Sequence, residues 1–188
     1  MIKILNFLKK GEMEKEEKIN FNTFSTISQK RGAIAIESTI KYDYWEIAQD
    51  PTPLIKNNIF KVYRGQKPLD LIAYCECTNF AISEKVKLLL EENKISGWSC
   101  YPIKIDKVEE NYYGFQITGI GGEITNREKD GCVPMFKPIK WDEKGWDGSD
   151  IFRLKDSGVK VCTEKVKDLF DKAKITNIIF NDTYSKLA

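Results

Sequence analysis

The sequence predicts an α+β fold in which a mostly antiparallel or mixed sheet carries two similar helix-strand units. The main observation is an internal repeat, because the segment 83–100 recurs as 163–180 with an offset of 80 residues. Seven residues recur unchanged at that offset: Glu84, Lys85, Val86, Lys87, Leu89, Lys94 and Ile95. The second observation is a set of short stretches rich in β-branched and aromatic residues, which are typical of strands. With 188 residues the chain is long enough for one sizeable core.

The part of the chain before the repeat begins with an arm over 1–20, in which a charged run follows a short apolar stretch. A single domain is expected from there to residue 182. Pro51 and Pro53 interrupt the chain, so a subdomain boundary, if there is one, is expected near 50–56. The segment 34–47 alternates only in part and reads as mixed strand and loop, and composition predicts short strands at 59–63 and 69–77.

The first copy of the repeat reads as a helix followed by a strand. Ser83 is a suitable N-cap, because its hydroxyl can accept from an unpaired amide of the first turn. An apolar stripe at helical spacing follows, made of Ile82, Val86, Leu89 and Leu90. Gly97 supplies a positive-φ turn after the helix, and 98–105 is then expected to be a strand.

Between the copies, 112–119 is expected to be a strand, and 132–139 is an edge strand or an extended segment because it contains two prolines. The segment 141–150 is rich in Gly, Asp and Trp and reads as a loop. In the second copy Thr163 replaces Ser83 as the cap, and Asn177 takes the place of Gly97. The tail 183–188 is expected to be loose.

Composition argues against several classes of function. The chain has no histidine, which removes the commonest general base, the usual catalytic triads and most zinc sites. Its 30 basic and 28 acidic residues give a net charge of only +2, so no nucleic-acid partner is expected. Five cysteines without a secretory signal predict reduced thiols in the cytoplasm, and no apolar run approaches the roughly 20 residues of a membrane span.

No motif predicts a catalytic, cofactor-binding or metal-binding residue. The Cys75-x-Cys77 pair lacks further ligands, and the glycines of 119–122 lack the Lys-Ser/Thr ending and the following helix of a phosphate-binding loop. Acidic residues of the loop 141–150 could still form a general acid/base pair, as in glycosidases. A small enzyme that acts on a nucleotide or glycan through these acidic residues therefore stays an alternative, as does a non-catalytic scaffold or homodimer.

Trp141 and Trp146 stand beside these acidic residues and admit two interpretations. Aromatic side chains next to carboxylates suit a protein interface, in which the ring buries area and the charge steers a basic partner. The same two rings could instead cap the hydrophobic core, and this second interpretation is favoured.

The chain from about residue 71 to residue 182 resembles a family of bacterial immunity proteins from polymorphic-toxin systems. The resemblance is carried by the helix start Ile82 to Val86, by the segment Trp146 to Phe152, and by the late helix that leads through Lys174 to Ile178 into a final strand. It implies a cytoplasmic, non-catalytic protein that binds a cognate toxin stoichiometrically. We expect the toxin to contact the loop through Trp141, Asp142, Glu143, Trp146, Asp147 and Asp150, with Trp146 as the anchor.

Overall fold

The structure is a computed structural model that describes residues 19–26, 32–76, 78–134 and 137–182. Most of the arm expected over 1–20 and the tail 183–188 lie outside these residues. The expected α+β character is confirmed, but the expected single sheet is wrong. The strands form two separate sheets, each containing parallel and antiparallel pairs.

The first sheet closes into a six-stranded barrel of order β2-β3-β6-β7-β5-β4, and the second is an open five-stranded sheet of order β11-β1-β10-β9-β8. The barrel strands are β2 (Ala35–Ser38), β3 (Ile59–Arg64), β4 (Leu71–Tyr74), β5 (Phe80–Ser83), β6 (Trp98–Ile105) and β7 (Tyr112–Ile117). The strands of the open sheet are β1 (Phe21–Thr26), β8 (Gly119–Glu123), β9 (Ile151–Lys155), β10 (Lys160–Thr163) and β11 (Ile178–Asp182). Two short helices, α1 (Tyr44–Ile47) and α2 (Thr52–Lys56), pack on the barrel through Ile47 and Leu54.

The two copies of the repeat form the helices α3 (Glu84–Glu92) and α4 (Glu164–Lys172). Ser83 caps α3 as predicted, because its Oγ accepts from the Val86 amide at 3.4 Å. Thr163 makes no such bond, and its hydroxyl instead donates to Asp150. The predicted positive φ is present after both helices, at +84° for Gly97 and +67° for Asn177.

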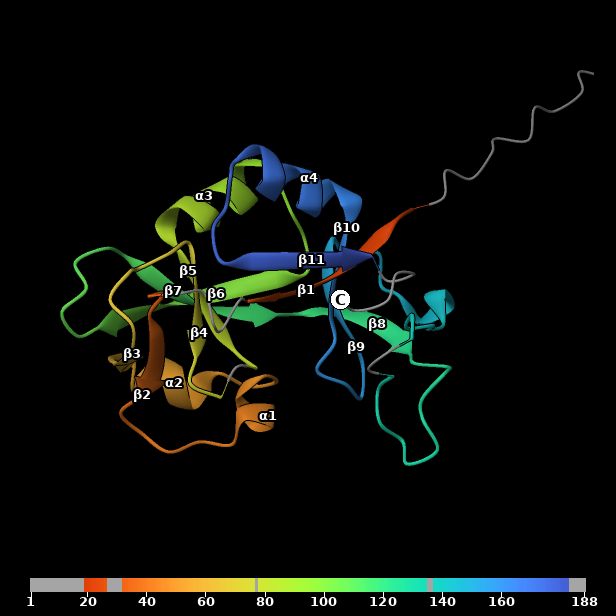
Figure 1. Ribbon diagram of the computed structural model, residues 1–188, viewed down its shortest axis with the longest axis horizontal. Helices are drawn as coiled ribbons and strands as arrows, with labels where there is room; N and C mark the ends of the chain where they lie inside the picture. The colour runs from red at the N-terminus through yellow and green to blue at the C-terminus, as the bar shows by residue number, and fades with distance from the viewer. Residues whose placement is uncertain (1–18, 27–31, 77, 135–136, 183–188) are drawn as a thin grey trace, which may run out of the picture.

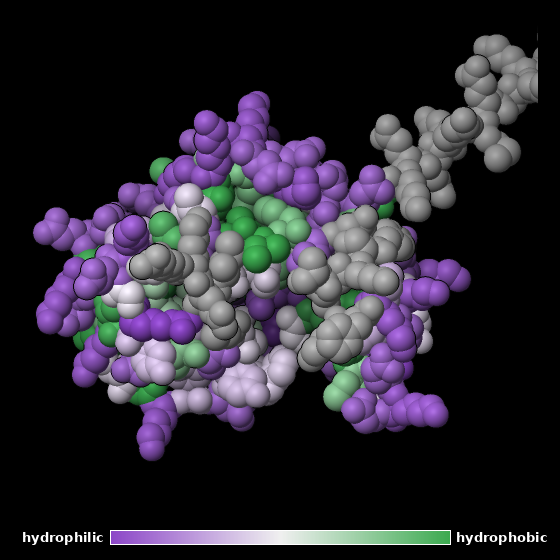
Figure 2. All heavy atoms as spheres, viewed as in Figure 1, coloured by the Kyte–Doolittle hydropathy of each residue, from purple (hydrophilic) through white to green (hydrophobic). Residues whose placement is uncertain are grey.

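Both helices cover one shared apolar cluster at the junction of the two sheets, and they lie side by side (Figure 1). The predicted stripes point into this cluster: Val86, Leu90, Val166 and Phe170 are buried, and Leu89 and Leu169 pack against it. Hydrophilic residues cover the outer face of the helices, with apolar side chains beneath them (Figure 2). The helices therefore join two sheets instead of packing on one.

The structural duplication extends well beyond the segments that are similar in sequence. In the first half, the order is β2-β4-β5-β7-β6, and in the second half it is β8-β9-β10-β1-β11. Equivalent pairs keep the same register: Ser83 lies opposite Tyr112 as Thr163 lies opposite Phe21, and both β2-β4 and β8-β9 are parallel. The N-terminal strand β1 thus occupies in the second half the position that β7 occupies in the first.

One difference between the halves explains why only the first is a barrel. The strand β3 pairs with both β2 and β6 and closes the first half. No described strand does the same for the second half, whose inner face is covered instead by Ile124, Ile139 and Trp141 from the segment between β8 and β9.

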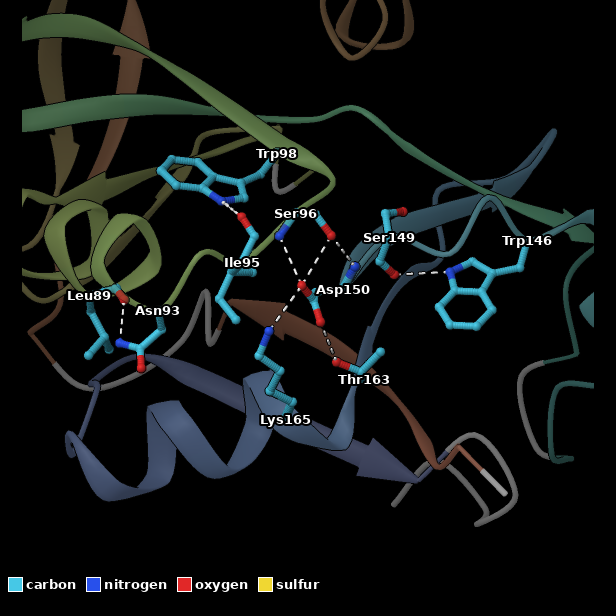
Figure 3. Close-up of polar contacts among 10 residues, drawn as sticks. All are labelled: Leu89, Asn93, Ile95, Ser96, Trp98, Trp146, Ser149, Asp150, Thr163 and Lys165. Carbon is cyan, nitrogen blue, oxygen red and sulfur yellow. Dashed lines mark hydrogen bonds and ion pairs between the residues drawn. The ribbon is translucent and has the colours of Figure 1, made fainter. Parts of the chain in front are cut away.

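Two aspartates tie the halves together by reciprocal hydrogen bonds. Asp70 in the first half accepts from the amide and hydroxyl of Thr176 in the second, at 2.8 and 2.9 Å. Asp150 in the second half accepts from the amide and hydroxyl of Ser96 in the first, at 3.0 and 3.1 Å (Figure 3). Asp70 and Asp150 are related by the repeat offset, as are Ser96 and Thr176, so each half holds the turn that follows the helix of the other half.

Removing one of these carboxylates should destabilise the fold, because it leaves a backbone amide without its partner. We expect Asp150→Ala to lower the free energy of unfolding by about 1–3 kcal/mol, measured by urea denaturation. Asp150→Asn keeps an acceptor oxygen and should cost less. The control Asp168→Ala removes an exposed carboxylate of α4. Equal stability of Asp150→Ala and this control would contradict the proposed role.

Placing a charge in the shared cluster should be more damaging. Val166 is 2% exposed, and an aspartate there would be buried without a partner. Val166→Asp should therefore lower the free energy of unfolding by more than about 3 kcal/mol. Leu88→Asp makes a similar change at an exposed position of α3 and serves as the control. The expected packing would be wrong if both variants had the thermal midpoint of the parent protein.

Candidate partner-binding site

The predicted site, 141–150, is a loop that covers the outer edge of β8. Its backbone pairs with that strand at two points, where the Asp142 amide donates to Glu123 at 2.9 Å and the Asp147 amide donates to Ile120 at 3.0 Å. One turn of 3₁₀ helix, η1 (Glu143–Gly145), lies between these bonds. The loop is therefore held to the sheet, and it satisfies backbone groups that a free edge strand would expose.

Both tryptophans of the loop pack on the inner face of the second sheet. Trp141 is buried at 9% exposure, with its ring centroid 5.2 Å from that of Phe21. Trp146 is half-buried, contacts Phe21 at 5.1 Å and Phe152 at 5.7 Å, and donates from its Nε1 to the Ser149 carbonyl at 3.0 Å. The rings thus cap a core cluster, which is the interpretation favoured from the sequence, and Trp146 presents only part of its surface.

Three of the predicted carboxylates, Asp142, Glu143 and Asp147, are exposed on this loop. Asp142 caps the 3₁₀ turn by accepting from the Lys144 amide at 3.1 Å. Asp147 accepts from the Ile120 amide at 2.8 Å and from the amide and hydroxyl of Ser149. Partial burial acts to raise the pKa of Asp147, but the hydrogen bonds from Ser149 and Ile120 outweigh it and lower the pKa. The loop therefore carries fixed negative charge.

Asp150, the sixth predicted residue, lies apart from that exposed group. Its carboxylate is half-buried and receives hydrogen bonds from Ser96 and Thr163 and an ion pair from Lys165 at 3.4 Å (Figure 3). These contacts place it between the two halves of the fold. The structure therefore leaves Asp142, Glu143 and Asp147 exposed on the same loop as Trp146, whereas Asp150 and Trp141 are turned into contacts with the rest of the fold.

A second acidic site was not predicted from the sequence. A pocket of about 470 Å³ near the N-terminus of α3 is lined by four carboxylates: Asp70, Glu84, Glu109 and Glu110. These residues come from three separate segments, and only the adjacent pair Glu109 and Glu110 is visible as a pattern in the sequence. Among the described residues, no group of three or more Cys, Asp or Glu side chains is arranged to hold a metal ion.

The turn between β4 and β5 carries a half-buried carboxyl group, Glu76. Its Oε1 accepts from the hydroxyl of Tyr42 at 3.3 Å and from the amide of Asn79 at 2.8 Å. Its Oε2 is buried without a hydrogen-bond partner among the described residues. Burial raises the pKa of Glu76 above its ordinary value of 4.5, although the hydrogen bonds from Asn79 and Tyr42 act in the opposite direction. The ionised form is therefore disfavoured in the folded protein.

The comparisons with known proteins add no family to this description. No protein-family model matches the chain, and no curated protein matches it. None of the helices in the described part of the chain combines the length and the hydropathy of a membrane-spanning segment.

The raised pKa of Glu76 predicts how stability changes with pH. Because the folded state binds this proton more tightly than the unfolded state, the contribution of Glu76 to stability falls as the pH rises from about 4.5 through the folded-state pKa. Glu76→Gln keeps an acceptor for Tyr42 and Asn79 without the charge. Its thermal midpoint should exceed that of the parent protein at pH 8, and the difference should shrink at pH 4.5. Glu46→Gln, at an exposed position, is the control, and a difference independent of pH would contradict the assignment.

Proposed function

We propose that this protein binds a cognate bacterial toxin stoichiometrically and neutralises it by covering its basic active-site cleft, without catalysis of its own. The proposal comes from the resemblance of 71–182 to immunity proteins. The structural observation that supports it best is the exposed group formed by Asp142, Glu143 and Asp147, on a loop whose two ends are anchored. We call this group the acidic loop surface.

The acidic loop surface is suited to binding because little of it has to become ordered in a complex. The backbone bonds to β8 and the packing of Trp141 and Trp146 hold the loop in place before any partner arrives. A preorganised surface loses less conformational entropy on association than a mobile loop does. Its carboxylates would attract a basic cleft over several ångströms, which raises the association rate most strongly at low salt.

The packing of the tryptophans decides which variants can test the proposal. Replacing Trp146 would remove ring contacts to Phe21 and Phe152, so a loss of binding could reflect a damaged core. Replacing Asp147 would remove the acceptor of two hydrogen bonds from Ser149 within the loop and of one from the Ile120 amide of β8. Glu143 is exposed and lies in the 3₁₀ turn between the two backbone bonds to β8, so it is the better position for a charge reversal.

The proposal predicts that a toxin gene lies directly upstream of the gene for this protein, and the test uses the toxin that it encodes. Glu143→Lys should weaken the complex about tenfold or more, mainly through a slower association, because it places a cation against a basic cleft. The complex is measured by surface plasmon resonance at low and physiological salt, and protection is measured by survival of cells that express the toxin. Glu92→Lys makes the same charge change at an exposed position of α3 and should behave like the parent protein.

Two outcomes would contradict the proposal. If the purified protein forms no complex with the toxin and gives no protection, the immunity function is wrong. If the complex forms but Glu143→Lys and Glu92→Lys both bind and protect like the parent protein, the toxin binds elsewhere and the acidic loop surface is not the site.

A further inference from the structure

A groove between the barrel and the open sheet gathers exposed apolar side chains. It has a volume of about 650 Å³ and lies between α1 and the turn joining β9 to β10, which are neighbours in Figure 1, and we call it the inter-sheet groove. Trp45 and Ile120 line it, although they are 43% and 59% exposed. Tyr44, itself 39% exposed, lies 5.2 Å from Trp45 between ring centroids. Apolar surface that gathers in one place on a soluble protein marks an interaction site.

The equivalent place in the first half of the fold is closed. There Ala35 on β2 lies opposite Ala73 on β4, and both are buried, at 3% and 1% exposure. The corresponding pair on β8 and β9 is Ile120 and Arg153. Paired residues of neighbouring strands share one face of the sheet, so an isoleucine and a guanidinium group stand where the first half has two small buried side chains. The second half therefore leaves open a surface that the first half buries.

Arg153 carries a charge in this groove that no carboxylate offsets. Its side chain is half-buried, and its Nη2 donates to the carbonyl groups of Ala48 and Ile117. No carboxylate among the described residues forms an ion pair with it. Burial lowers the pKa of the guanidinium group, because it disfavours the charged form. The site would therefore gain from an anion.

The other charged residues of the groove do not supply this anion. Lys155 is paired with Glu123 at 2.7 Å, and Asp156 is exposed in the turn after β9. A guanidinium group presents its donors in a planar fork that matches the two oxygens of a carboxylate. Such a charge-assisted hydrogen bond is stronger at a half-buried site than in bulk water. The groove therefore suits an acidic side chain from outside.

Trp45 stands at the edge of the groove in a fixed position. Its amide donates to the Asp43 side chain at 2.7 Å, and its ring lies against Gly158, where a Cβ would come 3.0 Å from the ring. The indole N–H forms no hydrogen bond with a described residue. Tryptophan, tyrosine and arginine are the residues most enriched in the hot spots of protein interfaces. The groove has all three within or beside it.

Ile120 joins the groove to the acidic loop surface. Its amide donates to the Asp147 side chain at 2.8 Å, and its carbonyl accepts from the Asp147 amide at 3.0 Å. A carboxylate of the acidic loop surface and an apolar side chain of the groove thus belong to two residues in direct contact. A partner that covers the acidic loop surface would extend over the groove.

We propose that the partner that binds the acidic loop surface also docks in the inter-sheet groove, where an acidic side chain of the partner pairs with Arg153 between Trp45 and Ile120. This inference rests on the proposed function, because it adds a second contact to the same complex. The two contacts have opposite charge, since the loop meets a basic group and the groove meets an acidic one. Together they fix the orientation of the partner.

The first test needs no partner and asks whether Arg153 accepts a carboxylate. Ile120→Asp places a carboxylate directly opposite Arg153, and Ile120→Asn places a neutral side chain of the same shape there. The thermal midpoint of Ile120→Asp at pH 7 and low salt should exceed that of Ile120→Asn by about 1 °C or more. The same two substitutions at Ile179, which is 43% exposed on β11, should show no advantage of aspartate. Equal midpoints of the two Ile120 variants would overturn the proposal.

The second test measures the complex with the toxin by surface plasmon resonance. Ile120→Asp should bind about tenfold or more weakly than Ile120→Asn, because its carboxylate occupies Arg153 and repels the acidic group of the partner. Trp45→Ala should weaken the complex about tenfold through faster dissociation, whereas Glu143→Lys acts on association. Tyr63→Ala removes an exposed ring from β3 and should bind like the parent protein. Arg153 is kept, because its bonds to two backbone carbonyl groups hold α1 and β7.

The outcomes separate the groove from the proposed function. Circular dichroism establishes that each variant is folded, and the two Ile120 variants remain a test if Trp45→Ala does not fold. If no complex forms, the proposed function is wrong and this inference fails with it. If Glu143→Lys weakens the complex but the folded Ile120 and Trp45 variants bind like the parent protein, only the groove is wrong.

Two further results would overturn the proposal. Tighter binding by Ile120→Asp than by Ile120→Asn would mean that the groove meets a basic group of the partner. A dimer of the parent protein that Ile120→Asp dissociates, measured by light scattering, would assign the groove to a second copy of the chain.

Discussion

The fold depends most on the crossed hydrogen bonds of Asp70 and Asp150. Each aspartate precedes the first strand of a β-β-helix unit and binds the turn after the helix of the other unit. Neither half contains both partners of its own contact, so each stabilises the other. The Leu71 and Ile151 amides add backbone bonds to the carbonyl groups of Thr176 and Ser96, at 3.3 and 3.1 Å. These crossed contacts thus hold the two helices next to each other over the shared apolar cluster.

In each half, the turn after the helix lies against the first residue of a strand in the other half. The two turns make this contact with different residues. A Cβ on Gly97 would lie 1.9 Å from the Ile151 carbonyl oxygen, so the absence of a side chain allows the contact. At the equivalent position Asn177 donates from its side chain to the Leu71 carbonyl at 2.7 Å. Both residues adopt a positive φ, but Gly97 allows the close approach by having no side chain, whereas Asn177 places a side-chain donor against the equivalent carbonyl.

Local features of the repeat could be predicted from the sequence because they depend on neighbouring residues. The cap at Ser83 and the stripe through Val86 and Leu90 follow from helix geometry alone. Which strands pair does not follow, because an alternating apolar pattern fits any partner that buries one face. The insertion of β1 between β10 and β11 joins residues 158 positions apart, as in the bond from Thr23 to Asn181, and no local pattern encodes that.

The loop 141–150 could be delimited from the sequence, but what its side chains pack against could not, for a related reason. The residue types of the loop 141–150 did not distinguish a core cap from an interface, and the distinction came from Phe21, a residue far away in the sequence that both rings contact. The acidic pocket beside α3 could not be predicted, because its carboxylates lie on three separate segments that only the fold brings together.

The position of β1 has a consequence for the connectivity of the molecule. In the first half β6 continues through residues 106–111 into its neighbour β7, whereas in the second half β11 and its neighbour β1 belong to opposite ends of the described chain. Asn22 lies opposite Asp182, so these ends meet where the first half has a short connection between adjacent strands. A link from β11 to β1 would give both halves the same strand order along the chain, β-β-helix-β-β. Along the described chain, the last strand of the second unit, β1, therefore comes first, and the hairpin that joins β6 to β7 has no counterpart between β11 and β1.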